Sequence, residues 1–516
     1  MQVIEDNLLL RTRNPQKITD KIPDSAILSV DNDIYTIKVD WDLPTAQKLA
    51  SLKMKNIPSP ITDGYKWSGI FSPMEHQKTT AEFLTLNPRA FCFNEQGTGK
   101  TAACIWAADY LMNEGYINKV LVICPLSIME SAWVDDLFTF APHLTVVMAY
   151  GNFEKGKKLI DTDVDFTIIN YDGVNVVKDE LAKQQYDLII IDEANAYKNA
   201  TTKRWRVMNK LVTSKTWLWM LTGTPAAQSP LDAHGIAKLC VPDNVVPSKT
   251  RFRDKVMYPI SQFKWIPQPH AQDVVHKTLQ PAIRFTKEEC LDLPEITYID
   301  RESPMTLQQQ HYYKILQTEF VMEAGDEYVT SANAAVNFSK LLQLSGGVVY
   351  SNSGEVIEFD VSNRLKVMKE VIDESIGKVL IFAPFKHTIE LIYSYLLSEK
   401  ISTETITGDK GVKFRTKTFS DFQSSNNPQV LIIQPQTAAH GLTLTAASTV
   451  IWYSPITSTE FYLQANARIN RKGQQNKMTV IHIHGTPAER RLYRLLSGRL
   501  EAHIKLLDLY EEIINN

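Results

Sequence analysis

The sequence predicts an α/β protein made of two tandem parallel-sheet lobes, with a helical insertion between them and a small N-terminal α+β domain. Two observations carry this prediction. Near-continuous apolar runs of strand length alternate with helical stretches from Trp67 to about Met220, and the alternation returns from Arg364 onwards. Such runs are typical of parallel strands that helices cover on both faces. Between these regions, residues 228–360 lose the rhythm and read as mainly helical.

The first 65 residues form a separate pattern. Two β-type runs joined by Asp-Asn-Asp predict a hairpin, and a helical stretch follows them. These three segments are Ala26–Val30, Ile34–Val39 and Thr45–Leu52. Pro58, Pro60 and Gly64 then interrupt the pattern and mark a linker. We therefore expect a small accessory domain over 1–65.

The rest of the chain divides into four parts. The first lobe, 66–227, has expected strands at Ala90–Phe93, Val120–Cys124, Thr145–Ala149, Phe166–Ile169, Leu188–Ile191 and Trp217–Leu221. The helical region, 228–360, has its clearest helices at Gln308–Glu323 and Ala332–Leu344. The second lobe, 361–500, has expected strands at Val379–Phe382, Val430–Ile433, Thr449–Trp452 and Thr479–Ile483. A C-terminal helix is expected over 501–516.

Composition excludes several classes of protein. The chain has 516 residues, 44% hydrophobic and 22% charged, which is ordinary for a folded soluble protein of about three domains. No apolar run approaches the roughly 18 residues that span a bilayer, and the N-terminus does not resemble a signal peptide. The five cysteines lie far apart, which argues against a disulfide framework or a zinc module and favours a reducing compartment. The net charge is −3, so charge alone demands no polyanionic partner.

A glycine-rich segment, Glu95-Gln-Gly-Thr-Gly-Lys-Thr101, follows an apolar strand and precedes a helical stretch. A phosphate-binding loop needs glycines so that backbone N–H groups approach the phosphates, a lysine for the β/γ oxygens and a hydroxyl for Mg²⁺. These groups are supplied by Gly97, Gly99, Lys100 and Thr101. The strict pattern has glycine six residues before the lysine, where this chain has Asn94. An ordinary glycine-rich turn is therefore the alternative.

Two carboxylates follow the apolar run Leu188–Ile191. The carboxyl end of a parallel strand is where ligands of open α/β sheets bind. Asp192 in this position is expected to hold Mg²⁺, and Glu193 to polarise the attacking water. An Asp-Glu pair alone is more often a solvated strand end, but a phosphate loop upstream favours an ATPase.

A basic segment in the second lobe runs from Gln464 to Gln474. Arg468 and Arg471 are three residues apart, so on a helix they project from the same side. Arginines delivered from a moving lobe can neutralise the charge that spreads over a transferring phosphoryl group. Taken alone, the segment reads equally as a basic surface helix.

The order of these segments resembles the Swi/Snf branch of the superfamily 2 helicase-like ATPases. The likeness covers about residues 66 to 500. In the first lobe, the glutamine motif resembles His76-Gln77, motif I Asn94–Thr101, motif Ia Val122–Ile128 with Trp133 after it, and motif Ib Ile169–Tyr171. Motif II resembles Asp192–Asn195, and motif III resembles Leu221–Pro225. In the second lobe, motif IV resembles Val379–Ala383, motif V Gln436–Ala446 and motif VI Gln464–Gln474. The compact chain resembles prokaryotic or viral members of this branch.

The resemblance implies two RecA-like lobes and the cofactors ATP and Mg²⁺. It assigns nucleotide binding to Gln77, Gly97, Thr98, Gly99, Lys100, Thr101 and Gln464, and the metal to Thr101 and Asp192. It assigns catalysis to Lys100, Asp192, Glu193, Arg468 and Arg471. It also implies DNA contacts through phosphates, at Ser127, Asn170, Thr437 and Thr443, hence weak sequence preference and strong salt sensitivity. Each of these four fits a helix cap or turn residue equally well.

The implied function is that of a DNA-dependent ATPase, a cytoplasmic monomer associated with DNA in a prokaryotic or virus-infected cell. It would translocate on duplex or branched DNA, remodel forks or recombination intermediates in repair and recombination, or displace bound protein. Two departures from the family pattern are Asn195, where histidine is usual, and the segment Ala226-Ala-Gln228 after motif III. The alternatives are an RNA helicase and a non-catalytic, ATP-gated clamp on nucleic acid.

Overall fold

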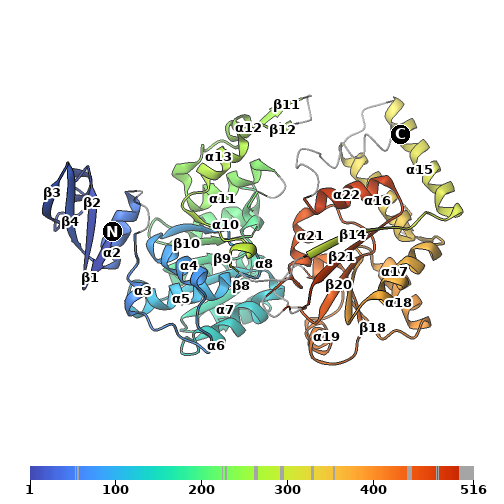
Figure 1. Ribbon diagram of the computed structural model, residues 1–516, viewed down its shortest axis with the longest axis horizontal. Coiled ribbons are helices and arrows are strands. Elements are labelled where there is room, and N and C mark those ends of the chain that lie inside the picture. Colours follow the sequence, from blue (N-terminus) through green and yellow to red (C-terminus); the bar gives the residue numbers. More distant parts are fainter. Residues whose placement is uncertain are drawn as a thin grey trace. The chain divides into compact units, whose positions relative to one another are not determined.

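The computed structural model divides the chain into two units, Met1–Cys290 and Leu291–Asn516, and each contains one large parallel sheet (Figure 1). The structure describes all residues except 53, 55–56, 224, 227–228, 261–264, 291–295, 327–330, 352–354, 439–443, 472–473, 475 and 499–516. The helical region expected at 228–360 is shared between the units, because 228–290 belong to the first and the remainder to the second. The five-part division of the chain stays a prediction.

The N-terminal residues form a four-stranded antiparallel sheet in the order β1-β2-β4-β3. Its strands are β1 (Gln2–Ile4), β2 (Asn7–Thr12), β3 (Ala26–Asp31) and β4 (Ile34–Asp40). The expected hairpin is β3–β4, and the expected helix is α2 (Leu43–Ser51), whose first turn is capped by the Asp42 side chain. Gln47 on α2 donates a hydrogen bond of 2.8 Å to the carbonyl of Thr85 at the end of α4 (Glu75–Leu86). Helix α2 is thereby attached to the helix that carries Gln77.

Seven parallel strands form the sheet of the first unit, in the order β13-β5-β10-β9-β6-β8-β7. They are β5 (Arg89–Cys92), β6 (Val120–Cys124), β7 (Val146–Met148), β8 (Phe166–Asn170), β9 (Leu188–Ile191), β10 (Trp217–Leu221) and β13 (Ala282–Ile283). The six strands expected in this lobe are confirmed; β13 was not expected. A short hairpin of β11 (Met257–Pro259) and β12 (Trp265–Pro267) lies outside the sheet.

The apolar runs of this sheet face two different cores. In β6, Val120, Val122 and Cys124 belong to one hydrophobic cluster, whereas Leu121 and Ile123 belong to another. Successive side chains of a strand point to opposite faces, so a strand covered on both sides must be apolar throughout.

The other helices of this unit are α1 (Gln16–Thr19), α3 (Ile61–Gly64), α5 (Lys100–Asn113), α6 (Asp135–Phe140), α7 (Phe153–Ile160), α8 (Tyr171–Val176), α9 (Lys178–Gln184), α10 (Lys203–Leu211), α11 (Ala233–Cys240), α12 (Lys249–Val256), α13 (Ala271–Thr278) and α14 (Lys287–Cys290).

The second unit repeats this arrangement with six parallel strands in the order β14-β21-β20-β17-β19-β18. They are β14 (Ile296–Glu302), β17 (Lys378–Phe382), β18 (Thr403–Ile406), β19 (Val430–Ile433), β20 (Ala447–Trp452) and β21 (Met478–His484), with β15 (Val348–Tyr350) and β16 (Val356–Glu358) in a separate hairpin. The four strands expected here are confirmed, whereas β14 and β18 were not expected. Two clusters again share alternate residues of one strand, since Leu380 and Phe382 of β17 face one core, and Val379 and Ile381 the other.

The two long helices expected before the second sheet are present as α15 (Leu307–Asp326) and α16 (Ser331–Gly346). The remaining helices are α17 (Ser362–Glu374), α18 (Lys386–Ser398), α19 (Val412–Ser424), α20 (Pro435–Ala438), α21 (Thr459–Asn466) and α22 (Pro487–Leu496). The helix expected over 501–516 lies outside the described residues. Among the residues that are described, none of the helices is both long and apolar enough to cross a bilayer.

Candidate active site

The phosphate loop connects β5 to α5 at the carboxyl edge of the first sheet. Gly97 and Gly99 have φ of 88° and 78°, in the left-handed region that favours glycine. A Cβ on Gly99 would lie 2.0 Å from Nε2 of Gln77, so the close approach of α4 also requires glycine there. Gly99 is the N-cap of α5, which places the first amides of that helix, including those of Lys100 and Thr101, at the loop. The N-terminus of a helix preceded by a glycine-rich turn is suited to binding phosphate.

The Lys100 ammonium lies across the loop. Its Nζ donates hydrogen bonds to the carbonyls of Asn94 at 2.8 Å and Glu95 at 3.2 Å, and the Thr98 hydroxyl donates to the Glu95 carbonyl at 2.8 Å. The charge of Lys100 also acts on the Cys92 thiol at the end of β5. Burial raises the pKa of the Cys92 thiol to about 11, although Lys100 acts in the opposite direction. The loop therefore holds the Lys100 cation beside the backbone of its glycine-rich segment.

Asn94 has a structural reason to replace the glycine of the strict pattern. Its side chain is 1% exposed, donates to Thr80 Oγ1 of α4 at 2.8 Å, and accepts from the amide of Phe285 at 3.0 Å. Phe285 follows β13, so one amide group ties the loop to α4 on one side and to the edge strand on the other. A glycine here would lose both bonds.

The glutamine motif lies directly on the phosphate loop. Oε1 of Gln77 accepts from the Met74 amide at 2.9 Å, and its Nε2 donates to the Gly99 carbonyl at 3.4 Å. Nε2 of the neighbouring His76 donates to the Thr98 carbonyl at 2.7 Å. The structure thus brings Gln77 to the loop that the sequence assigned to nucleotide binding, and its contact with a base stays a prediction.

The Asp-Glu pair ends β9, and β10 separates β9 from β5. One oxygen of Asp192 accepts from Nε1 of Trp133 at 3.1 Å, and the other accepts from the Glu193 amide at 3.0 Å. Trp133 is fully buried in a π-helical turn, Met129–Val134. The sequence marked Trp133 only as part of a motif. The structure shows that its indole fixes the orientation of the Asp192 carboxylate.

A hydrogen bond connects the phosphate loop to the Asp-Glu pair. Nε2 of Gln96 donates to Oε1 of Glu193 at 3.2 Å, and Glu193 itself has a left-handed φ of 51°. Tyr171 donates its hydroxyl to the carbonyls of both Asp192 and Glu193. Sequence reasoning missed Gln96 because no pattern in the sequence shows that two segments so far apart lie together. Tyr171 was singled out only as a motif residue.

Asn195, which stands where histidine is usual in the family that the sequence resembles, connects the Asp-Glu pair to the end of β10. Its Nδ2 donates to Oγ1 of Thr222 at 3.2 Å. Thr222 is completely buried and directly follows β10, in the segment that resembles motif III. The carboxyl ends of β5, β10 and β9 thus carry three segments that hydrogen bonds join into one site.

In the second unit, the expectation that one helix carries both arginines is wrong. Helix α21 ends at Asn466, and Arg468 and Arg471 lie in the turns that follow. The Arg468 carbonyl accepts from the amide of Leu444 at 2.9 Å, which diverts it from a helical bond. The Arg468 side chain is only 3% exposed, whereas Nε of Arg471 donates to the Ala467 carbonyl at 3.1 Å. A basic surface helix therefore does not describe this segment.

Gln464, also assigned to the nucleotide, lies on α21 of the second unit and is 2% exposed. Its Nε2 donates to Glu460 at 3.4 Å. Its Oε1 is buried and has no hydrogen-bond partner among the residues that the structure describes. Gln464 thus combines a bonded amide group with a buried, unsatisfied acceptor.

The four candidates for DNA contact differ in what surrounds them. Ser127 lies in the short turn Leu126–Ile128 after β6, and Asn170 is the last residue of β8, so both sit at the carboxyl ends of neighbouring strands. Thr437 on α20 donates its hydroxyl to the Gln434 carbonyl at 2.7 Å, as a turn residue does. Thr443 lies outside the described residues.

The described residues of the protein do not by themselves provide a complete set of metal ligands at this site. Within the described parts of the chain, no three His, Cys, Asp or Glu side chains gather closely enough to hold a metal ion. Mg²⁺ in phosphate-transfer sites is held by one or two carboxylates and by the substrate phosphates. Asp192 and Thr101, a carboxylate and a hydroxyl, are oxygen donors of the kind that this ion prefers.

Comparisons with known proteins agree with this architecture. The SNF2-related domain matches residues 76–345, and the helicase conserved C-terminal domain matches residues 363–473. A Mycoplasma genitalium protein described as an uncharacterized ATP-dependent helicase is 25% identical over 76% of this chain, which spans 37% of that protein's length. Protein p41 of Acyrthosiphon pisum secondary endosymbiont phage 1 is 24% identical over 86% of this chain and 98% of its own.

A solved structure, the Sulfolobus solfataricus SWI2/SNF2 ATPase core in complex with dsDNA, is 23% identical with a TM-score of 0.43, covering 87% of this chain and 97% of that one. The first curated relatives are longer proteins, of which this chain spans between 33% and 41%. The SNF2-related domain alone accounts for more than half of the 516 residues. This chain therefore belongs to the SNF2-related family, in a form whose relatives include a Mycoplasma and a phage protein.

Proposed function

We propose that this protein hydrolyses ATP and uses the cycle to translocate on DNA. The observation that carries the proposal is the hydrogen bond between Gln96 and Glu193. It joins a glycine-rich phosphate loop to a carboxylate pair at the carboxyl edge of one parallel sheet. Phosphoryl transfer to water requires a phosphate cradle and a group that orients the attacking water, next to each other.

Each residue of the site has a proposed part in hydrolysis. The loop amides and Lys100 bind the β- and γ-phosphates, and Gln77 reads the adenine beside the loop. Asp192 and Thr101 would hold Mg²⁺, which when bound supplies positive charge to the phosphate oxygens. Glu193 accepts a hydrogen bond from the attacking water and polarises it. Trp133 and Gln96 act as positioning residues, because each donates to one of the two carboxylates.

The second unit is proposed to supply Arg468, Arg471 and Gln464 to the same nucleotide. Arginines stabilise the charge that develops on a transferring phosphoryl group. Because Lys100 and the arginines belong to different units, hydrolysis would then depend on the two units meeting around ATP. Alternation between meeting and separation is the proposed source of movement along DNA.

DNA is proposed as the polymer because the chain carries both domains of an SNF2-type helicase. The Mycoplasma relative is described as an ATP-dependent helicase, which supports a nucleic-acid motor. Ser127, Asn170, Thr437 and Thr443 are the proposed phosphate contacts. Remodelling of forks or recombination intermediates, or displacement of bound protein, are the specific tasks that we propose for a motor of this kind.

The test measures ATP hydrolysis without polymer, with duplex DNA, with forked DNA and with RNA, for the wild-type protein and for Lys100→Ala. We expect DNA to stimulate hydrolysis and the variant to show none, because the charge on the β- and γ-phosphates is lost. The matched control is Lys210→Ala, at an exposed position on α10. Stimulation by RNA alone would identify an RNA helicase, and ATP binding without turnover would identify a clamp. Turnover by a folded Lys100→Ala protein would remove the phosphate loop from the mechanism.

A further inference from the structure

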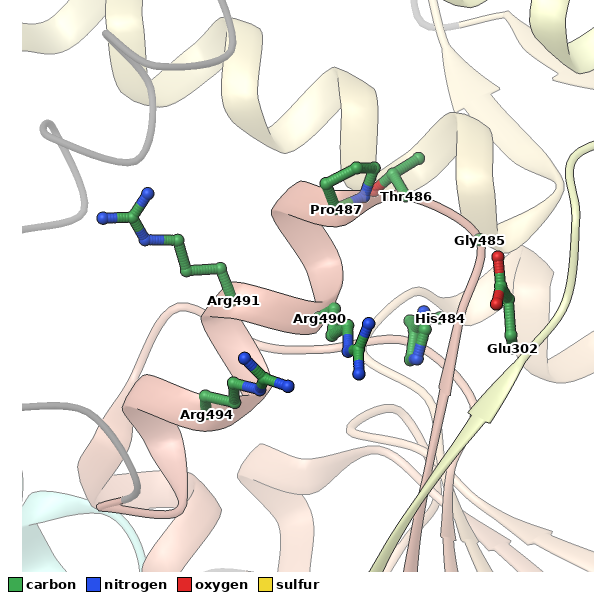
Figure 2. Close-up of a pocket in the computed structure, with 8 residues that line it drawn as sticks. All are labelled: Glu302, His484, Gly485, Thr486, Pro487, Arg490, Arg491 and Arg494. Atoms are coloured by element: carbon green, nitrogen blue, oxygen red, sulfur yellow. The ribbon is translucent and has the colours of Figure 1, made fainter.

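A basic pocket lies at the carboxyl ends of β14 and β21 in the second unit, where the chain turns into α22. The pocket has a volume of about 440 Å³. Figure 2 shows the residues that line it. It is lined by Glu302 at the end of β14, by His484 at the end of β21, and by Arg490, Arg491 and Arg494 of α22. None of these residues belongs to the nucleotide site described above.

The charges in this pocket are unbalanced. Among the described residues that line it, Arg490 and Arg494 face one carboxylate, that of Glu302, which gives these three side chains a net charge of +1 when His484 is neutral. Burial lowers the pKa of His484, and the nearby charge of Arg490 acts in the same direction, although the carboxylates of Glu489, Asp300 and Glu302 oppose it. Arg490 and Arg494 extend from α22 toward the same side as His484 and Glu302, whereas Arg491 extends from the other side (Figure 2).

The positive charge of Arg490 and Arg494 is not neutralised within the described part of the chain. Neither guanidinium has a carboxylate within 4.0 Å there. The two residues are four apart on one helix, where like charges are neighbours and repel each other. An anion bound between them would remove this repulsion.

The acidic residue of α22 does not offset these charges. Glu489 is 1% exposed and pairs with the buried Arg364 at 2.7 Å. Its other oxygen accepts from the Gly485 amide at 2.8 Å, and the Thr486 hydroxyl accepts from the Glu489 amide at 3.2 Å. The first turn of α22 is therefore already capped, and the guanidinium groups, not the helix N-terminus, make the anion site.

Guanidinium groups are planar forks that match the oxygens of a phosphate group. We propose that this pocket binds a backbone phosphate of the nucleic acid through Arg490 and Arg494. The inference rests on the proposed function and adds to it an anchor on the second unit. In the sheet order, β21 lies between β14 and β20. The pocket therefore lies at the same carboxyl-terminal side of the sheet as the end of β20, and the segment that contains Arg468 follows β20 in the chain. Nucleic acid held there would be held by the same unit that carries the proposed arginine fingers.

The test compares wild type with Arg490→Gln/Arg494→Gln by fluorescence anisotropy on a labelled DNA duplex. Loss of one phosphate contact weakens binding roughly 8-fold at about 0.1 M salt, because each neutralised duplex phosphate releases about 0.9 counterion. The slope of log affinity against log salt should become shallower by about 1. The ATPase rate without DNA should stay unchanged. The matched control, Lys366→Gln/Lys400→Gln, removes two exposed cations from the same unit outside the pocket. It should change the DNA affinity and the salt slope much less than the double-arginine variant does.

A variant of the opposite sign separates a local charge effect from damage to the fold. Glu302→Gln removes the one carboxylate among the described residues that line the pocket, so DNA should bind more tightly with an unchanged or steeper salt slope. Equal binding by wild type and the double-arginine variant overturns the proposal while leaving the proposed function intact. Failure of wild type to bind DNA at all overturns both.

Inorganic phosphate, titrated calorimetrically at constant ionic strength, distinguishes the two sources of a phosphate group. Weak binding of phosphate that the double-arginine variant loses together with DNA affinity supports a backbone phosphate in the pocket. Binding of phosphate that the variant loses while its DNA affinity stays at the wild-type value shows a site for a free anion and overturns the assignment.

Discussion

Two asparagines illustrate how single residues shape the candidate active site. Asn94 stands where the strict phosphate-loop pattern has glycine, and it bonds Thr80 and the Phe285 amide from a fully packed position. Asn195 stands where the family usually has histidine, and it bonds Thr222. In both places the side-chain amide connects segments that are distant in the sequence. The Asn94 amide is buried and bonds through both its nitrogen and its oxygen, which makes the arrangement of the loop rigid and unique.

At Glu193, we expect Glu193→Gln to retain ATP binding while hydrolysis falls roughly 10²-fold or more, the scale of a general base. The amide oxygen can still accept the bond from Gln96, but it cannot take part in polarising water. Rates at saturating ATP and a nucleotide-binding titration check this. Glu114→Gln, at an exposed position after α5, is the control. A rate near that of wild type would place the base elsewhere.

At Asn195, the replacement by alanine should uncouple hydrolysis from DNA, because the bond to Thr222 is lost. Asn195→His should retain more of the coupling, since an imidazole can also bond a hydroxyl. The measurement is the ratio of ATPase rates with and without saturating duplex DNA. An unchanged ratio in the alanine variant would show that this hydrogen bond does not transmit DNA binding.

Among the elements, α22 is held in place by a buried ion pair. Arg364 of α17 bonds the carbonyls of Ser345, Tyr453 and Ile483, and its guanidinium pairs with Glu489. One arginine thus fastens α16, β20, β21 and α22 together. Removing one partner of such a pair leaves an uncompensated charge inside the protein.

We therefore expect Glu489→Gln to lower the free energy of unfolding of the second unit by about 3 kcal/mol or more. Urea unfolding followed by circular dichroism measures it. Glu374→Gln breaks an ion pair with Arg301 that lies largely at the surface, and it should cost less than about 1 kcal/mol. Similar losses for the two variants would contradict the role given to the buried pair.

The elements that the sequence predicts are those whose residues are apolar throughout. β6 and β9 are fully buried and were predicted with their observed bounds. The missed strands lie at the edges of the sheets, where burial is weaker. β14 mixes apolar and polar residues, none of them buried, and β13 is two residues long. The end of α21 was missed because the turns after Asn466 involve contacts from outside the segment, such as the bond from the Leu444 amide to the Arg468 carbonyl.

The candidate site was predictable to the same extent. Glycines, a lysine and paired carboxylates can be recognised in the sequence by residue type and order. The sequence therefore predicted the candidate residues of the loop and of the strand end. Gln96 and Trp133 act by their position in space, and their roles appear only when β5, β9 and the turn after β6 are brought together. The burial of Arg468 likewise depends on packing that spacing does not encode.

For the whole molecule, the division into two units makes Arg471 the informative residue. Because Arg468 is 3% exposed, its replacement also tests folding, whereas Arg471 is partly exposed. We expect Arg471→Ala to lower the maximal rate at saturating DNA by roughly 10³-fold, the scale of an arginine finger. ATP binding, which we propose to rest mainly on the first unit, should change far less. Stopped-flow binding and steady-state rates measure the two quantities.

The half-saturating DNA concentration supplies the control for this prediction. A finger acts on the transition state, so the maximal rate falls while the DNA concentration needed stays similar. A defect confined to half-saturation would instead make Arg471 a DNA contact. The Arg490→Gln/Arg494→Gln protein gives the pattern expected of such a contact.

The strand order β5-β10-β9 also bears on how the first unit is made in the cell. The phosphate loop follows β5 and the carboxylate pair follows β9, yet β10, which is synthesised after both, lies between them. A nascent chain that has released only the loop and the carboxylates still lacks the strand that sets them side by side. Since a ligand that binds only the folded state stabilises it, nucleotide should protect the first unit from proteolysis only once residue 221 has left the ribosome. Nucleotide binding would in this way mark the insertion of β10 between β5 and β9 during translation, before β13 joins the sheet beside β5.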